Sequence, residues 1–346
     1  MKVRPRKGQG QRPLSQSEGG LPDGASFAVG KSRIDPAKTV GGQAVLEGVM
    51  MRAPAAWSVA VRAPDGEIIG RREKLSRLSE RNRGARIPFL RGIFVLGESL
   101  TLGFKALSWS AQKATDEEED PLTGVQIGWT MALAFAFFAG VFILLPALAA
   151  GVVAGESGIL FNVFEGLIRL GLFIGYIWAI GRSKEIARVF EYHGAEHMSI
   201  HAYEAGQPLS IESVAQYPPE HPRCGTSFLL IVVLGSIIFF SFFGVPGFFF
   251  LVVSRLVGIP IIAGLAYELL RWSGTRPDGR LAHWLALPGI WLQKLTTSVP
   301  DHDQIEVAIS SLVVALDEAS YDEVVGRGGV PETALTVRHS VLDREV

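Results

Sequence analysis

The sequence contains a single cysteine, Cys224, among its 346 residues. One cysteine cannot form an intramolecular disulfide, which excludes a disulfide-stapled secreted fold and suits a reducing compartment. The N-terminus lacks an apolar run preceded by basic residues, so we expect no cleavable signal peptide. Charge of one sign is not in excess either, because the formal net charge is -1. We therefore expect no nucleic-acid partner.

Apolar residues, by contrast, are abundant: they make up 48% of the chain, and the mean hydropathy is +0.28. A helix needs a long apolar run to cross about 30 Å of hydrocarbon at about 1.5 Å per residue. Four segments meet this requirement, namely Ile127–Ala149, Leu160–Ile180, Ser227–Phe243 and Gly247–Leu270. The sequence therefore predicts a mainly α membrane protein with about four transmembrane helices in two hairpins, and a small cytoplasmic α+β module. We expect membrane lipid to surround these helices.

The distribution of basic residues predicts the orientation in the membrane. The short connector Ala150–Gly158 carries no Lys or Arg, whereas basic residues follow the second and fourth apolar segments: Arg182, Lys184, Arg188, Arg271, Arg276 and Arg280. Positively charged loops stay on the cytoplasmic side. We therefore expect a multi-pass protein of the inner (plasma) membrane, with both termini and the loop Gly181–Thr226 in the cytoplasm.

The chain outside the two hairpins, 127–180 and 227–271, divides by composition. Within the cytoplasmic segment, the alternating run Trp57–Arg62 before Pro64-Asp65-Gly66 predicts a β-hairpin. The stretch Leu90–Ser110 has helical apolar spacing and fits an interfacial helix or part of a soluble cap. The expected parts are a disordered basic tail (1–38), a cytoplasmic α+β segment (39–126), a loop module (181–226), amphipathic helices (272–320) and a loosely ordered tail (321–346).

The residues that indicate chemistry lie in the loop module. On a helix, His193, His197 and His201 are successive i, i+4 neighbours and share one face. The pattern His193-x-x-Glu196-His197 matches the inverted zinc-protease motif, in which two histidines bind the metal and the glutamate activates water. We expect a divalent metal, zinc above others, with His193 and His197 as ligands and Glu196 as the catalytic base. The alternative is a structural hydrogen-bonding cluster.

Three further residues are candidates to complete the metal site. His221 and Cys224 flank a turn directly before the third apolar segment, and His-x-x-Cys spacing can supply two ligands. Cys224 could instead be a nucleophile activated by a neighbouring His or Arg, or the turn could be only the entry to a membrane helix. Glu268 has a suitable offset for a third ligand, although it could equally pair with Arg271 or Arg255.

Four ordered stretches carry a family resemblance. The sequences GGQAVLEGVMMR (Gly41–Arg52), YHGAEH (Tyr192–His197), HPRCGTSF (His221–Phe228) and LQKLTT (Leu292–Thr297) resemble bacterial proteins of the domain-of-unknown-function 1385 family. The resemblance runs from about Thr39 to Leu316. It implies this membrane topology and a metal-dependent enzyme, with His193, Glu196, His197, His221 and Cys224 at the matching positions. It supplies no reaction and no substrate.

These patterns support two hypotheses about function. The first is a metal-dependent hydrolase at the cytoplasmic membrane surface that acts on a lipid-linked or membrane-proximal substrate. The second is a non-catalytic membrane scaffold or assembly factor that binds a protein partner. In either case we expect Gly41–Arg52 to pack back onto the loop module through Glu47 and Arg52.

Overall fold

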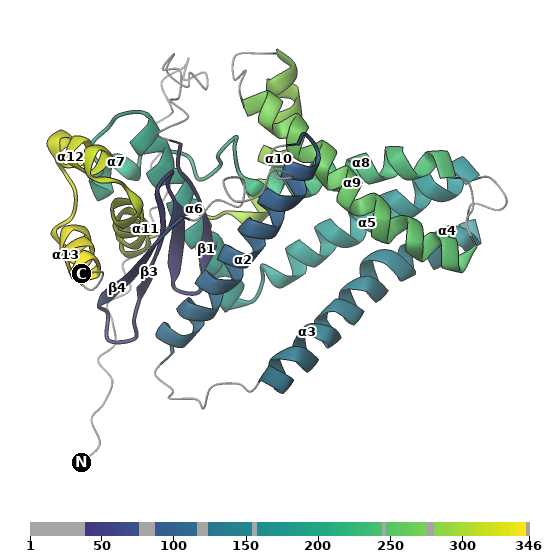
Figure 1. The fold of residues 1–346 in the computed structure, drawn as a ribbon, viewed down its shortest axis with the longest axis horizontal. Helices are drawn as coiled ribbons and strands as arrows, with labels where there is room; N and C mark the ends of the chain where they lie inside the picture. The colour runs from purple at the N-terminus through teal and green to yellow at the C-terminus, as the bar shows by residue number, and fades with distance from the viewer. Residues whose placement is uncertain are drawn as a thin grey trace.

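A computed structural model describes residues 39–75, 87–115, 124–153, 158–243, 247–274 and 280–343. The tail predicted to be disordered, 1–38, lies outside these residues. The described helices and strands form two parts (Figure 1). One is a lobe that contains a sheet, and the other is an arm of long apolar helices.

The lobe is built on a four-stranded antiparallel sheet in the order β1-β2-β3-β4. The strands are β1 (Gly41–Val45), β2 (Gly48–Arg52), β3 (Ala56–Arg62) and β4 (Ile68–Lys74). The predicted β-hairpin is confirmed, because β3 pairs with β4 in a register that sets Val61 opposite Ile69. Gly66 at its turn has a φ of 91°, a conformation that favours glycine.

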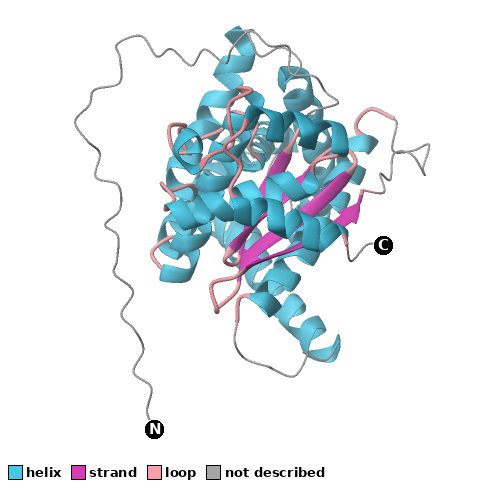
Figure 2. Ribbon diagram, turned by 90° about the vertical axis from the view of Figure 1, so that its left-hand side faces the viewer, coloured by secondary structure: helices cyan, strands magenta, loops and turns pink. Residues whose placement is uncertain are grey.

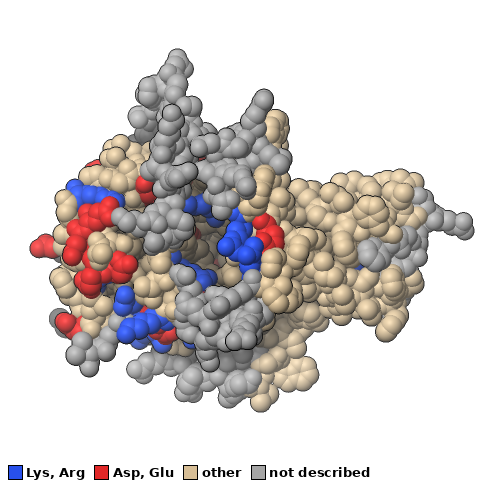
Figure 3. Space-filling model, turned by 45° about the horizontal axis from the view of Figure 1, so that its top comes forward, with Lys and Arg blue, Asp and Glu red and all other residues tan. Residues whose placement is uncertain are grey.

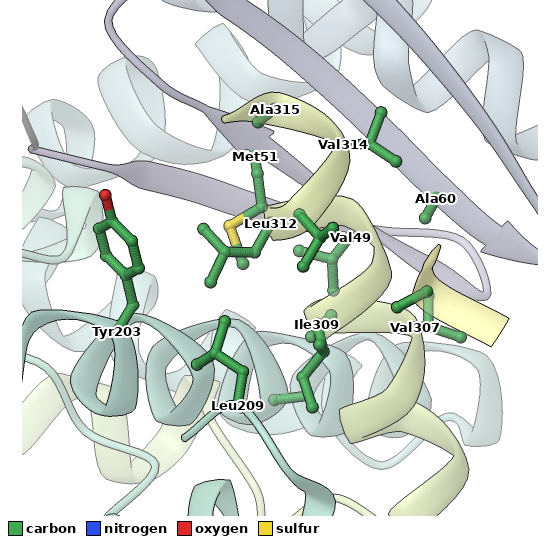
Figure 4. Packing of buried hydrophobic residues seen from close by; sticks show 14 of the residues in the cluster. Val49, Met51, Ala60, Tyr203, Leu209, Val307, Ile309, Leu312, Val314 and Ala315 are labelled. Carbon is green, nitrogen blue, oxygen red and sulfur yellow. The ribbon is translucent and has the colours of Figure 1, made fainter. Parts of the chain in front are cut away.

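Helices enclose this sheet (Figure 2). They are α6 (Lys184–Glu204), α7 (Ile211–Val214), α11 (His302–Ala315), α12 (Glu318–Arg327) and α13 (Glu332–Leu342). Helix α11 is buried along nearly its whole length, and its Ile309 and Leu312 pack against Val49, Met51 and Leu209 (Figure 4). The main core therefore lies between the sheet, α6 and α11.

The C-terminal region differs from the prediction of a loosely ordered tail at 321–346. Two helices, α12 and α13, occupy it, and α13 packs on α11 and β4. Its buried Arg338 donates to the carbonyl oxygens of Val313 (2.6 Å) and Leu316 (2.9 Å), which lie at the end of α11. The sequence did not reveal this role because an arginine on a short helix is normally a surface residue, and nothing in the sequence marks Arg338 as buried.

The arm consists of α3 (Gly124–Ala139), the π-helix η3 (Gly140–Leu144), α4 (Leu145–Val153), α5 (Gly158–Ile180), α8 (Gly225–Phe240), the short 3-10 helix η4 (Ser241–Phe243) and α9 (Phe248–Gly274). Three of the four predicted spans are long and apolar enough to cross a membrane: Gly128–Val153, Gly158–Ile180 and Val252–Ser273. The remaining one, Gly225–Phe240, is shorter. The surface of the arm is almost free of charged residues on the face that Figure 3 shows.

Two helices lie where the lobe and the arm meet. Helix α2 (Leu90–Lys113) packs against the sheet on one side and against α9 on the other (Figure 1). Helix α10 (Arg280–Thr296) packs along α8, where Gly289 allows close approach to Ser227. The end of α10, the middle of α6 and the start of α8 therefore meet at this junction.

Candidate metal centre

The histidine motif lies on α6, as the sequence predicts. This helix begins at the N-cap Ser183, whose hydroxyl accepts from the backbone N–H of Ile186 at 3.2 Å. The i, i+4 spacing brings the rings of His193 and His197 together, with centroids 4.4 Å apart and planes tilted by 56°. Gly194 lies between them because any Cβ there would collide with the carbonyl oxygen of Ser298. The motif glycine thus lets α6 approach the chain that follows α10.

Backbone carbonyl oxygens orient both rings. His193 Nδ1 lies 2.8 Å from the carbonyl oxygen of Thr296, and His197 Nδ1 lies 2.6 Å from that of Pro219. A carbonyl oxygen can only accept, so each Nδ1 carries a proton, and in the neutral ring this leaves the lone pair on Nε2. This is the tautomer and the kind of outer support that metal-binding histidines use.

Cys224 comes from the arm side of the junction. It is the N-cap of α8, and its sulfur accepts from the backbone N–H of Thr226 at 3.4 Å. The Cys224 Sγ atom lies 3.3 Å from His193 Nε2. Burial raises the pKa of the thiol, and the two contacts to Thr226 lower it in part. A positive helix end and a neighbouring metal ion would both favour the thiolate.

His193, His197 and Cys224 form a group that could hold a metal ion, with their donor atoms within 4.8 Å of one another. A tetrahedral zinc ion with bonds of about 2.0–2.3 Å places its ligand atoms about 3.5 Å apart. The 3.3 Å separation of His193 Nε2 and Cys224 Sγ already matches that geometry. The donor set of two imidazoles and one thiol also suits zinc.

His221 lies beside this group with its nitrogens otherwise engaged. Its ring centroid is 5.7 Å from that of His197. Its Nδ1 accepts from the backbone N–H of Arg223 at 3.2 Å, and its Nε2 faces Glu204 at 3.6 Å. In this arrangement neither nitrogen is directed at a shared ion. We assign His221 a supporting place beside the metal candidates.

Glu268 pairs with Arg91. It accepts from Arg91 Nε at 2.6 Å and also from Arg91 Nη2, which joins α9 to α2. The structure thus gives Glu268 a partner other than those that the sequence suggested, Arg271 and Arg255.

Glu196 has the most unusual environment of the motif residues. It is only 4% exposed, and within the described part of the chain its Oε2 has no hydrogen-bond partner. Burial raises the pKa of this carboxyl to about 8, and the Cys224 charge adds to the effect, whereas His193 and the Gly42 backbone lower the pKa. A Cβ at Gly42 would lie 3.1 Å from the Glu196 Cδ and would also collide with the carbonyl oxygen of Met50. Strand β1 therefore forms one wall of the site.

Burial also keeps the neighbouring histidines neutral. Desolvation lowers the pKa of His197 well below 6.5, and it lowers the pKa of His201 and of His221 to about 4. Neutral imidazoles are the form that binds metal ions. His201 itself contacts the carbonyl oxygen of Glu220 through Nε2 at 2.9 Å.

Several supporting residues escaped the sequence reasoning. Gln293 brackets the backbone of His221, accepting from its N–H at 2.7 Å and donating to its carbonyl at 3.0 Å. Thr296 and Pro219 contribute carbonyl oxygens, which leave no residue-type signal. Gln293 and Thr296 belong to the stretch Leu292–Thr297, whose family resemblance was the available signal. Glu47 was expected to contact the loop module, and it pairs with Arg188 on α6.

Known proteins resemble this chain over most of its length. A family model described as "Protein of unknown function (DUF1385)" matches residues 87–318. The uncharacterized protein YqhQ of Bacillus subtilis (strain 168) is 33% identical over 298 residues, which cover 81% of this chain and 92% of that protein. No solved structure matches.

Proposed function

This chain belongs to the DUF1385 family of proteins of unknown function, and from that premise we propose that it is a membrane-embedded, metal-dependent hydrolase. The observation that carries the proposal is Glu196, a buried carboxyl whose Oε2 has no hydrogen-bond partner among the described residues, on the helix that supplies two metal-type histidines. Buried groups without partners and with displaced pKa values are concentrated at functional sites. The family connection names no activity, so the argument for hydrolysis comes from the site.

The arm is proposed to span the inner (plasma) membrane as four helices in two hairpins, with the lobe and both termini in the cytoplasm. Helix α8 is short, but η4 rises about 2 Å per residue, so Gly225–Phe243 reaches about 30 Å. Five of the seven tryptophans are exposed at the lobe end of the arm and on α10, as in the aromatic belt at a membrane interface: Trp129, Trp178, Trp272, Trp284 and Trp291.

The metal ligands proposed here are His193, His197 and Cys224. Three protein ligands with one open position are typical of catalytic zinc sites, whereas structural sites have four. Zinc held this way would supply Lewis acidity and lower the pKa of water at the open position. His221 and Glu268 are not needed for this set.

Glu196 is proposed as the general base. Its Oε2 would take a proton from the attacking water and return it to the leaving group as the scissile bond breaks. The positive charge of the ion would draw the pKa of the carboxyl down from about 8 toward neutrality, where such a base works. The 4% exposure of Glu196 keeps bulk water away from this exchange.

The substrate is proposed to be lipid-linked or membrane-proximal. Cys224 caps α8 at the point where that apolar helix starts, so the site would lie at the level of the membrane surface. A group attached to a lipid would reach it at high local concentration.

Metal content tests the ligand assignment directly. We expect the full chain, purified in detergent, to hold about one zinc per chain, and the His193→Ala/His197→Ala variant to hold none. Glu196→Gln should keep its zinc because it removes no ligand. His201→Ala is the matched control, since it removes a histidine from the same helix face outside the group. A wild-type protein without metal after zinc-replete expression would refute the proposal.

Hydrolysis needs a second measurement. Proteoliposomes made with a lipid extract of the producing cell should accumulate a water-addition product, detected by mass spectrometry, that Glu196→Gln proteoliposomes lack. A zinc-loaded protein with identical lipid profiles for both forms would contradict hydrolysis of membrane lipids. That outcome would favour the alternative, a non-catalytic scaffold that binds a protein partner.

A further inference from the structure

Helices α2 and α9 cross at small residues. A Cβ on Gly92 would lie 2.9 Å from Tyr267 Cβ, and a Cβ on Gly264 would lie 3.0 Å from the carbonyl oxygen of Phe89. Only glycine allows the two backbones to approach this closely, as is common between helices in membranes.

An apolar groove lies beside this crossing. It has a volume of about 250 Å³ and is lined from α2 and its N-cap by Phe89, Leu90 and Ile93, and from α9 by Pro260, Ile261 and Leu265, with Gly264 at its base. Ile261 is 47% exposed and Leu265 is 45% exposed. No side chain of the described chain covers them, and every lining residue is apolar.

The groove has a polar end. Arg91 and Glu268 form an ion pair that joins the two helices, and the backbone N–H of Phe89 also donates to Glu268 Oε1, at 3.3 Å. Glu268 lies one helical turn beyond Leu265, toward the lobe end of α9. The apolar lining thus begins where this polar pair stops and continues along the part of α9 that is apolar enough to cross a membrane. A phospholipid has the same polarity profile.

Phe89 holds an unusual backbone conformation at the lip of the groove. Its φ is +69°, in the left-handed region that a bulky residue rarely adopts. Such residues are concentrated at ligand clamps, where the surrounding contacts hold them. Here the contacts are the Glu268 carboxylate on the N–H side and Gly264 against the carbonyl.

We propose that this groove binds one acyl chain of a bilayer phospholipid from the leaflet beside the lobe. The proposal rests on the membrane insertion of the arm, which is part of the proposed function, and is independent of the metal. The Arg91–Glu268 pair has no net charge, so we expect the acyl chain of the lipid, and not the charge of its headgroup, to determine binding. Three further exposed apolar residues of α2 continue the same helix face, which places α2 flat on the membrane surface: Leu100, Phe104 and Leu107.

Photo-crosslinking tests the proposal. The full chain is reconstituted in vesicles of phosphatidylethanolamine and phosphatidylglycerol with a trace of phospholipid that carries a diazirine in its acyl chain. Labelled residues are identified by mass spectrometry. We expect labels at 87–93 and 260–265 to exceed those on other lipid-facing positions of α9 at least about fivefold, with either headgroup on the probe.

Two variants fill the groove from opposite sides, and a third variant outside the groove serves as the control. Ile261→Trp and Ile93→Trp should each remove the enrichment. Val257→Trp, on the same helix one turn earlier and 58% exposed, should leave it unchanged because Val257 does not line the groove. Even labelling along α9, or enrichment that survives both filling variants in protein with wild-type thermal stability, would overturn the proposal. If carbonate washing instead extracts the protein from the vesicles, membrane insertion itself is refuted.

Discussion

At the scale of single residues, the candidate metal centre depends on groups that burial holds uncharged. His197, His201 and His221 have lowered pKa values, whereas Glu196 has a raised one. These opposite pKa shifts give opposite dependences of stability on pH, because a group stabilises the fold only in the protonation state that the folded protein prefers.

We predict that the metal-free protein is most stable near pH 6.5, the usual histidine pKa. As the pH falls from 6.5 toward 4, unfolded histidines take up protons that the folded ones reject, and stability is lost. As the pH rises from 4.5 to about 8, the unfolded Glu196 loses a proton that the folded one keeps, which also costs stability. Three histidines outweigh one carboxyl below 6.5, and Glu196 acts alone above it.

Thermal unfolding followed by tryptophan fluorescence, in detergent with EDTA, measures this dependence between pH 4 and 9. We expect the midpoint to fall by several degrees on each side, since about 1 kcal/mol shifts it by about 1–2 °C in a chain of this size. Glu196→Gln should lose the decline above pH 6.5 and keep the acid one. Identical curves for both proteins above pH 6.5 would contradict the assignment.

At the scale of elements, the arm is joined by a buried ionic network. Glu165 on α5 pairs with Arg169 one turn later and with Arg255 on α9, whose Nη2 lies 2.7 Å away. Arg169 Nε also donates to the carbonyl oxygen of Phe142 at 2.8 Å, inside the π-helix η3, where wider turns leave carbonyl groups without their usual α-helical partner. One carboxylate thus sets the register of three helices.

We predict that Glu165→Gln destabilises the arm by about 3–5 kcal/mol, because it leaves two buried guanidinium groups without a counter-charge. Unfolding in detergent with increasing denaturant measures the loss. The matched control is Glu323→Gln, which breaks another i, i+4 pair, that with Arg327, at the surface of the lobe. It should cost only about 0–1 kcal/mol. Equal effects of the two substitutions would show that the arm does not depend on the pair.

At the scale of the whole molecule, the lobe is completed by its last helix. Val337 and Val341 of α13 lie against Gly70 on β4, and Arg338 satisfies carbonyl groups at the end of α11. The last carbonyl groups of every α-helix have no partner within the helix, and burying them without another hydrogen-bond donor is costly.

Ending the chain after Gly328 should therefore unfold the lobe while the arm, in the proposed topology, stays in the membrane. We expect a loss of about 4 kcal/mol or more from the two valines and the Arg338 hydrogen bonds. Limited proteolysis of vesicles checks this, with lobe sites cut early and arm helices protected. A chain ending after Asp343 is the control and should resist like the full chain. Equal resistance of the shorter chain would contradict the role of α13.

Sequence reasoning succeeded where a local pattern determines the outcome. Strict alternation and a Pro-Asp-Gly turn gave the β3–β4 hairpin, and i, i+4 spacing placed His193 and His197 on one face of α6. Sequence reasoning failed where contacts between distant segments determine the structure. The burial of α11 on all sides, the capping by Arg338 and the pairing of Glu268 with Arg91 depend on segments more than twenty residues away, and no periodicity encodes them.

The central position of α11 has a consequence for biosynthesis. Strands β1 to β4 are translated before every arm helix, yet the residues that cover their inner face arrive with α11, after the last of those helices. While the ribosome is still producing the arm, the sheet lacks its main packing partner. The core of the lobe is thus completed only near the end of translation, so a chain that ends before α11 would contain all three metal candidates and still lack the packed core beside them.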